Sequence, residues 1–236
     1  MLSARREKCL EAIRKTGLDG VLFALSPNFE YVTESHNCFY QRDCFVLNAD
    51  IAGASVIPEA LVYVNKEGKS TILTIPKHRD SVNTLLNSVV VSYMDQFEDE
   101  LTHIIDGKNI GIGKYCDEWI IKTLKNVDKD IRTTMVEELF IDLRRIKDEK
   151  EIAHMAHLAK FTDEAVMYVC RHLKPGMTMW EAERMIVDYG LQHGMQDLSF
   201  SPTCGFKTRD TDNAQAIEPF ENERVFCEGT MSAFDI

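Results

Sequence analysis

Over the first 135 positions, short apolar runs alternate with amphipathic segments. Two of these runs flank the turn Asn65–Gly68 and predict a β-hairpin. The runs predicted to be strands are 21–25, 60–64, 70–75, 89–93 and 109–113. The segments predicted to be helices are 3–16, 78–86, 97–105 and 116–125. Strands that alternate with helices indicate an α/β domain with a mixed sheet.

After residue 135 the pattern changes to long helical periods. A linking helix is expected from 136, and the charged segment 144–151 marks a boundary. Asp148 and Glu151, and then Thr178 and Glu181, stand at capping-box spacing before two helices. The first helix repeats apolar positions at helical spacing: Ile152, Met155, Ala159, Thr162, Val166, Val169 and Leu173. We therefore predict two domains, 1–137 and 138–236, the second ending in a strand.

Composition narrows the classes of partner. The 236 residues carry a formal net charge of −11, with 44% hydrophobic and 28% charged residues. This balance is typical of a globular chain and disfavours nucleic acid or an anionic membrane as a partner. The N-terminus has no apolar signal core, and the seven cysteines form no regular framework. We expect a cytoplasmic protein with reduced thiols.

Asp235 is the residue of greatest chemical interest. It is a single carboxylate near the end of an apolar run that follows the turn at Glu228-Gly229, and we expect that run to be a buried strand. A carboxylate in such a place must be paired, bound to a cation, or used to cap a turn. From the residues alone, the capping role is the more frequent one. One carboxylate cannot hold a metal by itself, so any partners lie elsewhere in the chain or after Ile236.

Other candidate residues are better explained by packing or exposure. His154 and His157, with Glu151 before them, are spaced for one helix face, but the apolar stripe leaves them toward solvent. Incidental placement is the favoured interpretation of His36. Cys204, next to Gly205, is expected to be a packing thiol. The glycines of 109–113 lack the rest of a phosphate loop, and no nucleophile triad is recognisable.

Several segments, in the right order, resemble the creatinase/prolidase/aminopeptidase P family. Residues 18–22 and 26–33 resemble its "glDa…p.N..YltG" segment, and residues 143–152 resemble "lR.iKs..Ei", the entry to the catalytic domain. Residues 174–181 resemble its "l.pG.tE.e" turn. Residues 200–205 and 228–236 resemble the strands "f..iv.sG" and "l..Gd.v..D.G".

This resemblance implies an α/β fold: a mixed-sheet, creatinase-like N-terminal domain followed by part of an α+β "pita-bread" catalytic domain. It implies a Xaa-Pro peptidase, in which two divalent metals (Mn, Co or Zn) and a metal-bound hydroxide cleave the bond before proline in a peptide substrate. Asp235 matches the first metal Asp. The second Asp, the His and the two Glu of the family would follow Ile236. We therefore expect a truncated chain that binds no metal pair and is inactive alone.

One departure from the family keeps alternatives open. Family peptidases carry a His in a "pHa.p" motif before the metal strand, whereas residues 214–219 of this chain contain no His. A creatinase-type hydrolase that needs no metal, and a non-catalytic binding or dimerisation module, therefore remain alternatives. The family also implies a homodimer.

Overall fold

The computed structural model describes residues 3–35, 58–116, 118–195, 198, 201–207 and 225–236. The chain divides into two compact units, Met1–Ile146 and Lys147–Ile236, and each is described by itself. In the described part of the chain, no helix is both long and apolar enough to cross a membrane. His36, whose placement the sequence indicates is incidental, lies outside the described residues.

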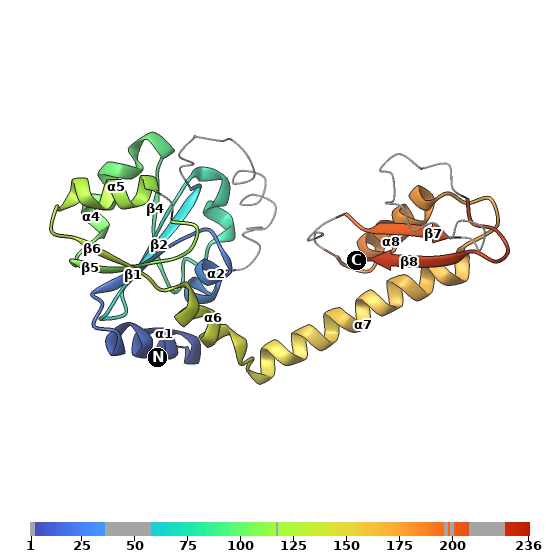
Figure 1. The fold of residues 1–236 in the computed structure, drawn as a ribbon, viewed down its shortest axis with the longest axis horizontal. Coiled ribbons are helices and arrows are strands. Elements are labelled where there is room, and N and C mark those ends of the chain that lie inside the picture. The colour runs from blue at the N-terminus through green and yellow to red at the C-terminus, as the bar shows by residue number, and fades with distance from the viewer. Residues whose placement is uncertain (1–2, 36–57, 117, 196–197, 199–200, 208–224) are drawn as a thin grey trace. The chain divides into compact units, whose positions relative to one another are not determined.

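The first unit is built on a six-stranded mixed sheet (Figure 1). Its strands are β1 (Gly20–Ala24), β2 (Ala60–Asn65), β3 (Ser70–Thr74), β4 (Ser88–Val91), β5 (Asn109–Ile112) and β6 (Arg132–Met135). Their spatial order is β4-β3-β2-β1-β5-β6. The predicted hairpin is confirmed, because β2 and β3 are antiparallel; β2 is also antiparallel to β1, and the other neighbours are parallel. The predicted mixed α/β fold is therefore confirmed.

Helices cover both faces of this sheet. One face packs against α1 (Ala4–Lys15), α2 (Pro27–Thr33) and α6 (Glu137–Arg145), around a core that includes Phe23, Phe29 and Phe140. The other face packs against α4 (Phe97–Ile104) and α5 (Glu118–Val127), around Phe97 and Ile120. Alternate side chains of β1 enter the two cores, because successive strand residues point to opposite faces.

Local structure differs from the sequence prediction in four places. Ser26 caps α2 and Pro27 starts it, where only a turn was expected. Ser and Pro are common both in turns and at the start of helices, so their presence does not distinguish the two. The helix predicted over 78–86 is wrong: a 3-10 turn, η1 (Pro76–Ser81), is followed by non-helical backbone. The edge strand β6 was not predicted, and a second 3-10 turn, η2 (Met94–Gln96), precedes α4.

The second unit consists of two helices and a two-stranded antiparallel sheet. The helices are α7 (Glu149–His172) and α8 (Met179–Gln192), and the strands are β7 (Thr203–Lys207) and β8 (Met231–Asp235). Both predicted capping boxes are present. The core contains Val169, Ala182, Ile186, Cys204 and Phe206, so the sheet packs against the helix pair.

Candidate metal-ligand strand

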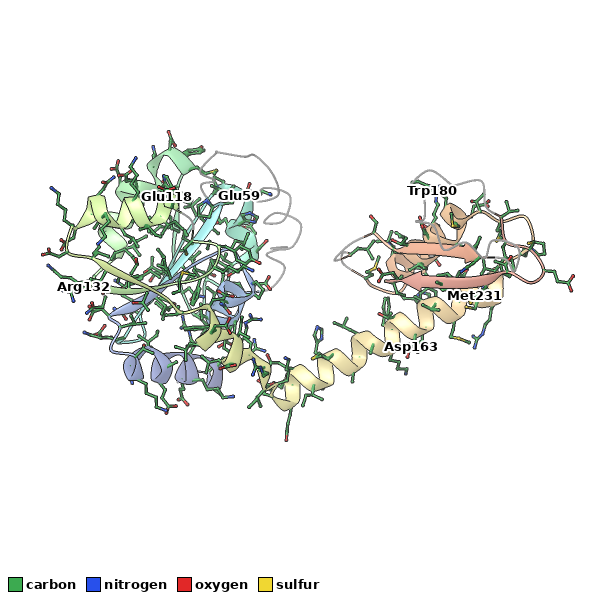
Figure 2. The ribbon with its side chains drawn as sticks, in the orientation of Figure 1. Glu59, Glu118, Arg132, Asp163, Trp180 and Met231 are labelled. Carbon is green, nitrogen blue, oxygen red and sulfur yellow. The ribbon has the colours of Figure 1, made fainter. Side chains whose placement is uncertain are left out.

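Strand β8 begins after a tight turn. The backbone N–H of Thr230 donates to the carbonyl of Cys227 at 3.1 Å, and Gly229 adopts a φ of 80°, which favours glycine. The Thr230 hydroxyl accepts from the Cys227 N–H at 3.0 Å. Met231 then projects from the start of the strand (Figure 2). The turn therefore fixes where β8 starts and, with it, the face on which Asp235 emerges.

Asp235 lies opposite Thr203 in the β7–β8 pair. Phe234 and Ile236, on either side of it, pack against the core of the second unit, so Asp235 points to the other face of the sheet. Asp235 is exposed, as are Thr203, Ala233 and Met231 of the same face. The prediction that this strand is buried is therefore wrong: its residues are exposed or half-buried, and within the described residues helices cover only one face of the two-stranded sheet.

Glu183 holds β7 against α8. Its carboxylate accepts the backbone N–H of Cys204 at 2.9 Å, from one helix turn before the buried Ile186. Cys204 is itself buried, and burial, helped by Glu183 and Cys170, raises the pKa of its thiol to about 12. The thiol therefore stays protonated at neutral pH and is a packing group, as predicted. Sequence reasoning did not identify the role of Glu183.

The histidines of α7 do not form a ligand set. His154 and His157 are exposed, and the Glu151 carboxylate is engaged at the helix start, where it accepts the Asp148 N–H at 2.8 Å. Across the described ranges, no group of three or more His, Cys, Asp or Glu residues could hold a metal ion. Asp235 alone supplies one oxygen-bearing ligand, so the described residues do not fit the dinuclear metal pair implied by the family.

The glycine-containing run after residue 108 is strand β5, as the sequence indicated. A Cβ on Gly111 would approach Val136, Leu18 and Val21 to between 2.8 and 3.0 Å, and one on Gly113 would lie 2.5 Å from the Phe23 ring. These two glycines are thus required by close packing between β5 and its neighbours. They do not form a phosphate-binding loop.

Comparison with known proteins shows that the sequence and fold of this chain are similar to those of proline-specific peptidases. No family model matches the chain. A curated Xaa-Pro dipeptidase of Pyrococcus horikoshii is 25% identical over 177 residues, which are 75% of this chain and 44% of that protein. The family resemblance seen in the sequence is confirmed by such relatives, which are prolidases, Xaa-Pro dipeptidases and aminopeptidases P.

Solved structures show the same fold. A prolidase of Pyrococcus horikoshii OT3 aligns with a TM-score of 0.63 and 20% identity, over 86% of this chain and 53% of that one. Proline aminopeptidase P II of Yersinia pestis aligns with a TM-score of 0.68 and 13% identity, over 100% of this chain and 59% of that one. The chain thus spans about half the length of the relatives it matches.

Proposed function

We propose that this chain carries the N-terminal domain, 1–137, and the first part of the catalytic domain, 138–236, of a Xaa-Pro peptidase-like hydrolase. The match to the Xaa-Pro dipeptidase supports this proposal most strongly. It extends over 177 residues, whereas the first unit ends at Ile146, so the match includes part of the second unit. The substrate class would be a peptide with proline after the cleaved bond, and the location cytoplasmic.

Asp235 would be a metal ligand in this hydrolase. Its exposed position, on the sheet face opposite the core, leaves its oxygens accessible to an ion. Carboxylate oxygens suit Mn²⁺ among the divalent metals implied by the family, although Co²⁺ or Zn²⁺ would also accept them. Because the described residues supply no second and third ligand beside it, we propose that the 236-residue chain alone binds no metal pair and has no peptidase activity.

The test is titration of the 236-residue chain with Mn²⁺ or Co²⁺, read by calorimetry and by hydrolysis of a Xaa-Pro dipeptide. We expect no micromolar binding that depends on Asp235, and hydrolysis equal to a metal-free control. Turnover well above that control, absent in Asp235→Ala, would refute the incomplete-site proposal. Because Asp235 is exposed, Asp235→Ala is expected to fold as the wild type does, and Asp188→Ala on the exposed side of α8 serves as a matched control.

Two alternative functions are supported by the absence of a His in residues 214–219, where the family peptidases have one. A creatinase-type hydrolase would cleave its amidine substrate in the presence of a chelator. A non-catalytic binding or dimerisation module would show no turnover under any of these conditions. The nucleotide sequence after the Ile236 codon distinguishes the peptidase from both, since only the peptidase requires a second Asp, a His and two Glu there.

A further inference from the structure

One face of the β7–β8 sheet carries a charged residue at each end. Cys204 and Phe206 enter the core of the second unit, so the residues that alternate with them lie on the other face, as Asp235 does. The strand pairing sets the residues of this face opposite one another as Thr203–Asp235, Gly205–Ala233 and Lys207–Met231. Asp235 therefore stands at one end of the face and Lys207 at the other, about 13 Å apart along the strands.

Gly205, in the middle of this face, has no packing or backbone reason to be glycine within the described residues. Every other glycine described has either a positive φ or a neighbour within 4 Å of an added Cβ, and Gly205 has neither. Glycine inside a strand lowers stability, and it often marks a place where a ligand or another backbone approaches the sheet closely. With the small Ala233 opposite, Gly205 leaves the middle of the face open to an extended peptide.

Lys207 is placed to bind an anion at the end of this face. It is half-buried at the last position of β7, opposite the apolar Met231. In the parts of the chain that the structure describes, no hydrogen bond or ion pair engages its ammonium, and Asp235 is too far along the face to pair with it. An ammonium beside small and apolar residues favours a negatively charged group on whatever ligand lies there.

We propose that Lys207 determines ligand specificity at this face: its ammonium binds a carboxylate of a peptide that lies extended over Gly205 and Ala233. The inference rests on the proposed function, which supplies the peptide. An extended chain advances about 3.3 Å per residue and the flexible lysine stem covers part of the distance, so the carboxylate would lie about two to four residues from the peptide residue over Asp235. That carboxylate is either the peptide's C-terminus or an Asp or Glu side chain.

The test is titration of the isotope-labelled 236-residue chain with three peptides, followed by NMR at the backbone amides of Gly205 and Ala233. Gly-Pro-Gly-Gly has a free C-terminal carboxylate, the amide of Gly-Pro-Gly-Glu has a side-chain carboxylate, and the amide of Gly-Pro-Gly-Gly has neither. We expect a peptide with a carboxylate to bind at least about tenfold more tightly than the one without, which is about 1.4 kcal/mol. Whether the first or the second peptide gains this affinity identifies the source of the carboxylate.

Variants of Lys207 test whether its charge is responsible. Lys207→Gln should reduce the preference for a carboxylate to less than about twofold, and Lys207→Arg, which keeps the charge, should retain it. Lys150→Gln, at an exposed position near the start of α7, is the matched control and should leave the preference unchanged. Equal affinity of the wild type for all three peptides would overturn the proposal. So would a preference that survives in Lys207→Gln, or Gly205 and Ala233 amides that do not shift at millimolar peptide.

Gly205→Val separates a ligand-binding role of this residue from a structural one. Valine favours strands and its Cβ would have open space, so the urea midpoint of the second unit, followed at Trp180 in a Trp119→Phe background, should rise. Peptide binding should nevertheless weaken at least about fivefold, because the new side chain would lie where the peptide does. A Gly205→Val chain that binds the peptides as tightly as wild type would show that nothing approaches the sheet at this glycine.

Replacing proline in the peptide distinguishes this inference from the proposed function. If Gly-Ala-Gly-Gly binds as tightly as Gly-Pro-Gly-Gly and the preference for a carboxylate remains, then proline specificity is wrong and the role of Lys207 stands. If proline increases affinity and the carboxylate does not, then the role of Lys207 is wrong and the proposed function stands.

Discussion

The Glu183 carboxylate accepts the backbone N–H of Cys204 at 2.9 Å, joining helix α8 to strand β7. This contact lies on the side of β7 that does not pair with β8, since an antiparallel strand directs alternate backbone groups to its two sides. It therefore satisfies a backbone donor that the two-stranded sheet leaves unpaired. Because β8 is registered against β7, the same contact helps to fix the position of Asp235.

Glu183→Ala is expected to destabilise the second unit by about 1–2 kcal/mol, since the half-buried N–H of Cys204 loses its acceptor. Exchange of the Cys204 amide should become roughly tenfold faster or more. Glu183→Gln retains an acceptor oxygen and should lose less stability than Glu183→Ala. Urea unfolding followed at Trp180, in a Trp119→Phe background, reports on the second unit. Unchanged exchange at Cys204 in Glu183→Ala would contradict the assignment.

Glu34, which ends helix α2, has a φ of 52° in the left-handed region, and it is the one non-glycine residue described with a positive φ. Its carboxylate accepts a hydrogen bond from the hydroxyl of Ser3. It also lies near the nearly buried Arg6, whose pKa is lowered by burial and raised by the charge of Glu34. The family segment that residues 26–33 resemble continues with glycine at this position. Side-chain contacts thus oppose a backbone cost of about 1–2 kcal/mol.

Comparing two variants separates the contribution of the Glu34 side-chain contacts from the cost of its left-handed backbone. Glu34→Ala removes the contacts and keeps the strained backbone, so it should destabilise the first unit by about 1–2 kcal/mol. Glu34→Gly removes both, so we expect it to be more stable than Glu34→Ala by about 1 kcal/mol. Urea unfolding followed at Trp119, in a Trp180→Phe background, measures the difference. Equal stability of the two variants would show that the backbone at residue 34 carries no strain.

Asp19 should make the first unit sensitive to acid. Its carboxylate accepts the N–H groups of Lys108 and Asn109, each at 3.0 Å, and the ammonium of Lys66 at 2.8 Å. Lys66 and these two N–H groups lower the pKa of Asp19 to about 2. A lowered pKa contributes stability above the unfolded value of about 4, and that contribution is lost as pH falls toward 2.

Asp19→Ala is expected to cost about 1–2 kcal/mol at pH 7, with a smaller difference from wild type at pH 2. The measurement is the free energy of unfolding of both proteins across pH 2–7. Lys66→Ala is the control, because it removes the exposed cation and keeps both backbone donors. If the stability that Asp19→Ala loses relative to wild type does not change with pH, then packing, rather than the ionised carboxylate, accounts for that loss.

The parts of the fold found from sequence are those fixed by local pattern. The apolar runs of β1, β2 and β3 contrast sharply with their flanks, and the capping boxes at Asp148 and Thr178 have defined spacing. The helix expected over 78–86 fails because Asn83 and Asn87 bond to backbone instead: Asn83 Oδ1 accepts the Leu85 N–H at 3.1 Å, and Asn87 Nδ2 donates to the Thr33 carbonyl at 2.9 Å. The bond of Asn87 depends on α2, which is distant in sequence, and it is therefore not visible in the local pattern.

The candidate site was less predictable, because it depends on what covers each surface. The stripe expected along α7 is buried only toward its C-terminal end, at Val169 and the neighbouring Ala165, where α8 and the sheet pack against it. Ile152 and Met155 carry the same sequence signal but are exposed. Asp235 has the apolar neighbours of a buried strand, yet the described part of the chain covers only one face of its sheet. Periodicity shows which residues share a face; it does not show whether anything packs there.

Tyr63 and Asp106 join β2 to the segment after α4. The Tyr63 hydroxyl donates to Asp106 Oδ1 at 2.8 Å, and Asn65 Nδ2 donates to Asp106 Oδ2 at 2.8 Å. Burial and the Asp106 carboxylate raise the pKa of Tyr63 well above its usual value. The folded state therefore keeps the phenol protonated at a pH where the unfolded chain loses that proton, and stability contributed by Tyr63 falls as pH rises above about 10.

Two variants test this contact and its packing. Tyr63→Phe should cost about 1–2 kcal/mol at pH 7, since Asp106 loses one donor, and should remove part of the loss of stability above pH 10. Gly20→Ala should also destabilise the first unit, by about 1–3 kcal/mol, because the new Cβ would lie 2.5 Å from the Tyr63 ring. In Tyr63→Phe the ring still occupies that space, so adding Gly20→Ala should cost about as much as before. Chemical unfolding at pH 7 and pH 10.5 measures both effects. If Tyr63→Phe loses stability above pH 10 as steeply as wild type, the alkaline sensitivity has another source.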